Sequence, residues 1–211
     1  MEPFKLDQQH INETVEELST LGDMLRWGAT LFNQGGVFYG HGNENAWDEA
    51  VAIALHVLAL PIDSKDSILT CRLLRRERLA IAQSFAVRIN ERVPTAYITN
   101  NAWFSGLQFY VDERVLVPRS PIAQMISVNF EPWLKGHAVH RALDLCTGSG
   151  CIAIAIANQF VEAEVDAVDI SHDALDVANI NIFEHAMEER VIPIQSDLMN
   201  EVLMFATSNA S

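Results

Sequence analysis

Residues 137–211 alternate between short apolar runs and helical patterns, and this alternation restricts the fold more than any other feature of the chain. Three runs have the length and composition of buried strands: Val139–Leu145, Ala163–Val168 and Val191–Ile194. Two segments between them have helical apolar spacing, Cys151–Phe160 and a stretch that begins at Ser171 or His172. The order β-α-β-α-β is typical of a parallel sheet with crossover helices. We therefore expect an α/β domain that contains the first half of a doubly wound sheet.

The first 93 residues have a different pattern and predict a separate helical domain. Helical spacing runs from Val15 to Leu25, a second helix is expected after the N-cap Asn45, and a third runs from Asp63 or Ser64 to about Asn90. Residues 94–136 then form a connector, in which 96–98 and 107–117 are rich in aromatic and β-branched residues and predict a β-hairpin. A short helix is expected over 122–129. The predicted domains are 1–93, 94–136 and 137–211.

Composition and charge exclude several classes of protein. Of the 211 residues, 49% are apolar and 20% charged, which argues against a disordered chain. No apolar run approaches the ~20 residues of a membrane span, and no signal peptide is recognised. The net charge of -14 should repel nucleic acid and suits a basic protein partner or a neutral or cationic ligand. We expect a cytoplasmic protein with neither a disulfide framework nor a metal site, because its three cysteines form no CxxC ladder.

Carboxylates and glycines gather at the predicted ends of three successive strands. Asp144 lies in the first strand, Gly148 and Gly150 form the turn that follows it, and Asp169 and Asp197 end the second and third strands. Ligands of open α/β sheets bind at the carboxyl ends of the strands, where bare backbone and a helix N-terminus can approach them. A carboxylate at the end of the second strand can accept both hydroxyls of a ribose. These residues therefore predict a nucleotide-type binding site.

Two nucleotide classes fit this pattern. The spacing Gly148-x-Gly150-x-x-Ala153 matches the dinucleotide fingerprint and so allows a nicotinamide-dependent oxidoreductase. Asp144 favours S-adenosylmethionine, because an acid there would repel a pyrophosphate and attract a cationic methionine moiety. Asp197 is suited to the adenine amino group. The alternative for both acids is structural, with Asp144 capping the turn and Asp197 capping a loop. Cys146 and Cys151, which flank the turn, are interpreted as packing residues rather than a redox pair.

Six segments resemble the HemK-type protein-glutamine N5-methyltransferases, and in particular the branch that acts on large-ribosomal-subunit protein three. They are Phe38–Glu49 (FYGHGNENAWDE), Arg92–Tyr97 (RVPTAY), Val115–Pro121 (VLVPRSP), Ala142–Ala155 (ALDLCTGSGCIAIA), Val165–Ser171 (VDAVDIS) and Gln195–Leu198 (QSDL). Cys146 stands where other branches usually have glycine. The resemblance extends over nearly the whole chain up to Leu198.

The resemblance implies a helical substrate-recognition domain, a short hairpin and a Rossmann-like class I methyltransferase sheet. It also implies S-adenosyl-L-methionine as cofactor and a basic ribosomal protein as partner, whose glutamine side-chain amide receives the methyl group. By motif position the cofactor-binding residues are Asp144, Cys146, Thr147, Gly148, Ser149, Gly150, Asp169, Ile170, Asp197 and Leu198. The loop Cys146–Gly150 and Asp169 would hold the methionine and ribose portions, and Asp197 and Leu198 would border the adenine.

One motif of the family is missing from this sequence. The family holds the glutamine amide with Asn-Pro-Pro-Tyr after its fourth strand, and this tetrapeptide does not occur here. We therefore assign no catalytic residue and expect a truncated member that does not methylate on its own. The alternatives are a non-catalytic module that binds a basic ribosomal protein and a nicotinamide-dependent oxidoreductase fragment.

Overall fold

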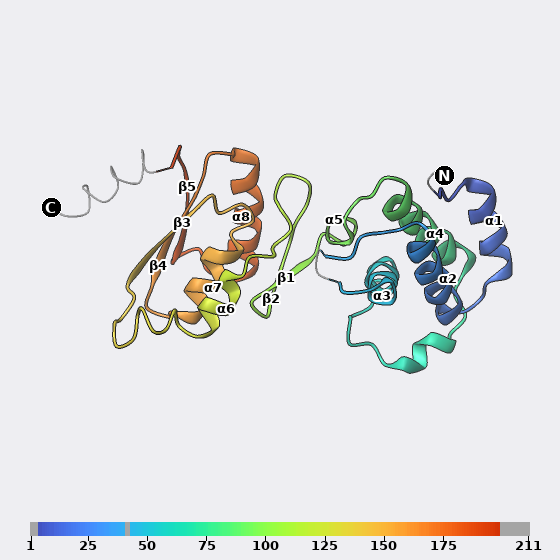
Figure 1. The fold of residues 1–211 in the computed structure, drawn as a ribbon, viewed down its shortest axis with the longest axis horizontal. Helices are drawn as coiled ribbons and strands as arrows, with labels where there is room; N and C mark the ends of the chain where they lie inside the picture. Colours follow the sequence, from blue (N-terminus) through green and yellow to red (C-terminus); the bar gives the residue numbers. More distant parts are fainter. Residues whose placement is uncertain (1–3, 41–42, 199–211) are drawn as a thin grey trace. The chain divides into compact units, whose positions relative to one another are not determined.

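The protein divides into two compact units, residues 1–99 and 100–211 (Figure 1). The computed structural model describes residues 4–40 and 43–198. The division falls between Thr99 and Asn100, a few residues after the boundary expected near residue 93. The difference arises because Thr95–Thr99 is a short helix, α5, that packs against α3 of the first unit rather than forming part of a connector.

The first unit is helical, as its sequence predicts. Its elements are α1 (Gln8–Glu17), α2 (Leu21–Gln34), α3 (Ala46–Val57), the 3-10 helix η1 (Asp66–Thr70), α4 (Arg75–Asn90) and α5. The helix expected through Val15 and Leu25 is interrupted at Thr20, which exchanges hydrogen bonds with Asp23 in a capping box and so starts α2. Asn45 caps α3 as predicted, since its side chain accepts a hydrogen bond from the Asp48 amide. The third predicted helix is two elements, η1 and α4.

A buried ion pair crosses the core of this unit. Glu49 of α3 and Arg88 of α4 lie among apolar side chains with only 2% and 4% of their side-chain surfaces exposed. The Arg88 guanidinium donates to both carboxylate oxygens of Glu49, at 2.7 and 3.2 Å. It also donates to the carbonyl of Phe38, at 2.9 Å. The pair therefore joins α3, α4 and the segment before α3.

The second unit contains a hairpin followed by the alternating strands and helices. Its elements are β1 (Ala102–Phe104), β2 (Leu107–Phe109), α6 (Ile122–Ser127), β3 (Arg141–Leu145), α7 (Cys151–Gln159), β4 (Glu164–Asp169), α8 (His172–Glu184) and β5 (Val191–Gln195). The hairpin is present and turns at Ser105 and Gly106, both of which have positive φ. Its first strand is 102–104 and not 96–98, because the latter residues belong to α5.

The three-stranded sheet is parallel throughout, in the order β3-β4-β5. This arrangement confirms the predicted α/β class and the first half of a doubly wound sheet. Figure 1 shows α7 and α8 on the same face of the sheet. Three large apolar side chains of the strands remain partly exposed. Leu143 and Leu145 of β3 and Ile192 of β5 have 38–41% of their surfaces exposed. Within the described residues β3 pairs with β4 alone, so the strand that the doubly wound order places in the centre is an edge here.

No helix among residues 4–40 and 43–198 is long and apolar enough to span a bilayer.

Candidate functional site at the carboxyl ends of the strands

The loop between β3 and α7, residues 146–150, turns sharply at the carboxyl end of the sheet. Cys146, Gly148 and Gly150 have φ angles of 62°, 56° and 77°, in the left-handed region that glycine adopts without strain. A Cβ on Gly150 would lie 3.3 Å from the Cβ of Ala178 on α8, whereas a Cβ on Gly148 would meet nothing within 4 Å. Gly150 thus allows close packing of helix and loop, and Gly148 leaves open space beside the backbone.

Asp144 is buried under this loop. Its Oδ2 accepts hydrogen bonds from the Thr147 hydroxyl at 2.6 Å and from the Ala153 amide at 3.1 Å. Burial raises the pKa of this carboxyl above its ordinary value, and the nearby Asp169 charge acts in the same direction. These contacts correspond to the structural role considered for Asp144, that of a turn cap. They also weaken the argument that its charge alone distinguishes a sulfonium from a pyrophosphate.

Asp169 brings the three strand ends together. Its Oδ2 accepts a hydrogen bond from the Gly148 amide at 2.9 Å, and its Oδ1 accepts one from the Ser171 amide at 3.0 Å. Its backbone carbonyl accepts a hydrogen bond from the Ser196 amide, just after β5, at 3.1 Å. Each carboxylate oxygen has a further lone pair, so Asp169 can still accept hydrogen bonds from two hydroxyl groups.

The other predicted residues line the same edge with different exposure. Thr147 and Ser149 are buried, and Cys146 is exposed at the start of the loop. Ile170 is 66% exposed after β4. Asp197 and Leu198 follow β5, both exposed. The edge therefore presents acceptor oxygens, bare backbone and two exposed apolar side chains, the mixture that a nucleoside requires.

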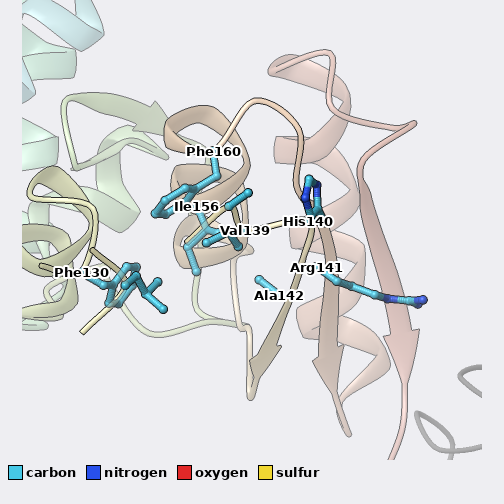
Figure 2. A pocket seen from close by; sticks show the side chains of 9 residues that line it. Phe130, Val139, His140, Arg141, Ala142, Ile156 and Phe160 are labelled. Atoms are coloured by element: carbon cyan, nitrogen blue, oxygen red, sulfur yellow. The ribbon is translucent and has the colours of Figure 1, made fainter. Parts of the chain in front are cut away.

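A hollow in the second unit lies away from these strand ends. It has a volume of about 380 Å³ and is lined mainly by apolar residues of three parts of the chain, the segment between α6 and β3, the amino end of β3 and the region of α7: Phe130, Leu134, Ala138, Val139, His140, Arg141, Ala142, Ile156 and Phe160. Figure 2 shows Ile156 and Phe160 beside Val139, while the Arg141 side chain extends away from them. The Arg141 guanidinium donates a hydrogen bond to Asp166 Oδ2 at 3.1 Å. Since the acids lie at the opposite ends of the strands, this hollow is not the candidate site.

Asn181, which contacts the loop from α8, was not identified from the sequence. This side chain is fully buried on α8 and donates a hydrogen bond to the Ser149 carbonyl at 2.8 Å. The signal was present in the sequence, because an asparagine at position 181 follows Ala174 and Ala178 on the buried face of an apolar helix. A polar residue on such a face requires partners, and these identify the loop that it supports.

One group of potential metal ligands is exposed near the start of α8. Ligand atoms of His172, Asp173 and Asp176 lie within 4.8 Å of one another. No metal site was expected from the sequence, because that expectation rested on the spacing of the cysteines, whereas this group consists of one histidine and two carboxylates on helix α8.

The two cysteines that flank the turn differ in burial, and this predicts different reactivity. Burial raises the pKa of the Cys151 thiol to about 11, so it stays protonated and unreactive at neutral pH. In folded protein at pH 8, iodoacetamide should modify the exposed Cys146, with Cys151 reacting only as the pH approaches 11. Peptide mass spectrometry with denatured protein as the control would measure this. Equal labelling of both cysteines at pH 8 would contradict it.

The sequence of the chain is similar to those of known methyltransferases. Residues 130–207 match the methyltransferase small domain family. The chain is 46% identical over 188 residues to the ribosomal protein uL3 glutamine methyltransferase of Neisseria gonorrhoeae, covering 89% of this chain and 63% of the relative. The chain is thus similar to methyltransferases over most of its length. The corresponding protein of Neisseria meningitidis serogroup A is 45% identical, with 89% and 62% covered.

Both relatives are named as glutamine methyltransferases, which agrees with the resemblance that the sequence motifs indicate. The chain spans a little less than two thirds of the length of these relatives. Among solved structures, the tRNA m1G37 methyltransferase of M. jannaschii is 25% identical with a TM-score of 0.38, covering 47% of this chain and 30% of that one. The N-terminal domain of human METTL16 in complex with SAH is 16% identical with a TM-score of 0.39, covering 56% and 46%.

Proposed function

We propose that this chain is the cofactor-binding and substrate-recognition part of an S-adenosylmethionine-dependent methyltransferase that modifies a glutamine side-chain amide of a large-subunit ribosomal protein. The observation that carries the proposal is the hydrogen bond from the Gly148 amide to Asp169, which unites the glycine loop with the end of the second strand of the sheet. The names of the relatives at 45–46% identity supply the substrate.

The residues at this edge fit such a cofactor. Asp169 retains acceptor capacity for the two ribose hydroxyls. The open space at Gly148 lets a ligand reach the backbone, and a side chain there would fill it. Ile170 and Leu198 offer exposed apolar surface for the adenine ring, with Asp197 as acceptor for its amino group. When bound, S-adenosylmethionine supplies an electrophilic methyl group on a sulfonium centre.

The remaining chemistry is mainly one of positioning. An amide nitrogen is a poor nucleophile, because its lone pair is delocalised into the carbonyl group. The protein must therefore hold the amide so that the lone pair faces the methyl group. The tetrapeptide that does this in the family, Asn-Pro-Pro-Tyr, does not occur in these 211 residues. The proposal assigns cofactor binding to this chain and expects no methyl transfer from the chain by itself.

The helical unit supplies the proposed contact with the ribosomal protein. Residues 1–60 contain nine acidic and two basic residues. Glu13, Glu17 and Asp48 are exposed. A ribosomal protein is basic, so attraction between unlike charges would guide the encounter, in the cytoplasm where such proteins are made. The same observation favours a second candidate function, a non-catalytic module that binds this partner.

Calorimetry of the whole chain with S-adenosylmethionine tests the cofactor claim. We expect saturable binding, and its absence at millimolar ligand would overturn the claim.

Capture of the purified ribosomal protein by the chain, repeated at low and high salt, tests the proposed partner. Electrostatic recognition predicts capture that weakens as salt rises. If the chain captured the ribosomal protein but bound no cofactor, only the second candidate function, the non-catalytic binding module, would remain.

A further inference from the structure

Asn181 uses its whole side-chain amide to connect two distant segments. Its Oδ1 accepts a hydrogen bond from the Tyr110 amide at 2.7 Å, and its Nδ2 donates to the Tyr110 carbonyl at 3.0 Å. The same Nδ2 donates to the Ser149 carbonyl at 2.8 Å. An asparagine amide offers two hydrogens and one oxygen, and all three are engaged here. Asn181 therefore joins the residue after the hairpin to the loop of the candidate site.

The loop receives support from α8 at two positions one turn apart. Ala178 lies against Gly150, where an added Cβ would be only 3.3 Å from the Ala178 Cβ. Asn181, one turn further along the helix, holds the Ser149 carbonyl. The first contact sets how closely helix and loop approach each other. The second sets the orientation of the peptide plane between Ser149 and Gly150.

Tyr110 is itself held at its other end. Its hydroxyl donates a hydrogen bond to Asp112 Oδ2 at 3.0 Å, and Asp112 is bound by the Arg114 guanidinium at 2.6–3.1 Å. The segment after the hairpin is thus anchored through both its backbone and its side chains. Because Tyr110 is held in place by these contacts, its hydrogen bonds to Asn181 also fix the position of the Asn181 side chain next to the loop.

We propose that Asn181 is a positioning residue for the cofactor-binding loop, which it holds in register with Tyr110. The inference rests on the proposed function, because the loop matters in this way only if it binds the cofactor. Asn181 is buried behind Ser149 and acts through that carbonyl. By motif position the loop holds the methionine portion of the cofactor, so a misplaced loop should weaken contacts with that portion most.

Two ligands that differ only in this portion separate a positioning role from a general structural one. S-adenosylhomocysteine carries the amino-acid portion, and methylthioadenosine lacks it. For Asn181→Ala we expect roughly tenfold weaker binding of S-adenosylhomocysteine, because a displaced loop would lose one to two hydrogen bonds to the amino-acid portion of the ligand. Binding of methylthioadenosine should change by less than about twofold. Asn181→Asp keeps the acceptor for the Tyr110 amide and loses the donors, so it should show the same selectivity.

Two control variants account for lost stability. Ile182→Ala removes a buried apolar side chain from the same helix, next to Asn181, and should lower the melting temperature without changing the ratio of the two affinities. Asn90→Ala removes a similar clamp in the helical unit, where Asn90 binds the amide and carbonyl of Leu6 at 2.9 Å each. It should leave both affinities unchanged.

The outcomes distinguish this inference from the proposed function. Wild-type chain that binds neither ligand would overturn the cofactor site itself. Wild-type chain that binds both, with an unchanged affinity ratio in the folded Asn181 variants, would overturn only the role of Asn181. Faster amide hydrogen exchange at Gly148 and Gly150 in ligand-free Asn181→Asp than in ligand-free Ile182→Ala would support the positioning role. Equal exchange in the two variants would contradict it.

Discussion

Replacing Glu49 with alanine is expected to destabilise the helical unit by about 3–5 kcal/mol, because it leaves the Arg88 guanidinium buried without its counter-ion. Both side chains are almost completely buried, and the pair makes two hydrogen bonds between α3 and α4. Urea unfolding followed by tryptophan fluorescence reports on this unit when the exposed Trp103 and Trp133 of the second unit are replaced with phenylalanine. The Trp27 ring then reports on the core, since it lies 6.1 Å from that of Phe85.

An exposed ion pair provides the matched control. Glu16 and Arg75 interact at 2.9 Å with 66% and 59% of their side-chain surfaces exposed. Glu16→Ala should therefore change stability by no more than about 1 kcal/mol. The double variant Glu49→Leu/Arg88→Met replaces the buried charges with apolar groups and should recover most of the lost stability. Equal effects of Glu49→Ala and Glu16→Ala would show that the buried pair has no special role.

Replacing Asp169 with alanine is expected to weaken binding of S-adenosylmethionine by roughly a hundredfold or more. The carboxylate is the proposed acceptor for two ribose hydroxyls, and hydrogen bonds to a charged group contribute about 1.5–3 kcal/mol each. The same change frees the Gly148 amide, whose hydrogen bond to Asp169 orders the loop. Calorimetric titration of wild type and variant measures the difference.

Asp166→Ala is the control for this experiment. Asp166 lies on the same strand, three residues before Asp169, and interacts with Arg141 at 3.1 Å, away from the glycine loop. Its loss should affect stability more than affinity. If Asp169→Ala bound the cofactor as tightly as Asp166→Ala, the ribose assignment would be wrong.

The α/β unit was more predictable than the helical unit because its signals are local and repeated. The strands lie in short segments rich in apolar residues, and the helices begin at the glycine loop and at Ser171. The observed ends of β3, α7, β4, α8 and β5 therefore differ from the predicted ones by at most two residues. In the helical unit, helical apolar spacing continues across Thr20, but the helix is interrupted there. The hydrogen bonds between Thr20 and Asp23 form a capping box, which starts a new helix despite the continuous spacing.

The positions of the candidate residues along the sheet edge were predictable from the sequence, whereas their contacts with one another were not. The sequence placed Asp144, Gly148 and Asp169 at neighbouring strand ends, since parallel strands end at one edge of a sheet. It could not say whether each carboxylate faces the ligand or the protein. Asp144 is buried under the loop, whereas Asp169 lies at its surface and binds the Gly148 amide. That distinction depends on which backbone amides come within reach after packing.

From the sequence alone followed the class of fold, the order of its strands and helices, the resemblance to a methyltransferase family and the gathering of carboxylates and glycines at one edge of the sheet, because these depend on periodicity, glycine positions and motifs that neighbouring residues carry. The tertiary structure alone decided which buried polar groups pair with each other within each unit. Asn181 reaches Ser149 and Tyr110 across 32 and 71 residues, and Arg88 reaches Glu49 across 39. Such contacts form only when packing brings distant segments together. Each contributes to stability because a buried polar group has no access to water and needs a hydrogen-bond partner within the protein.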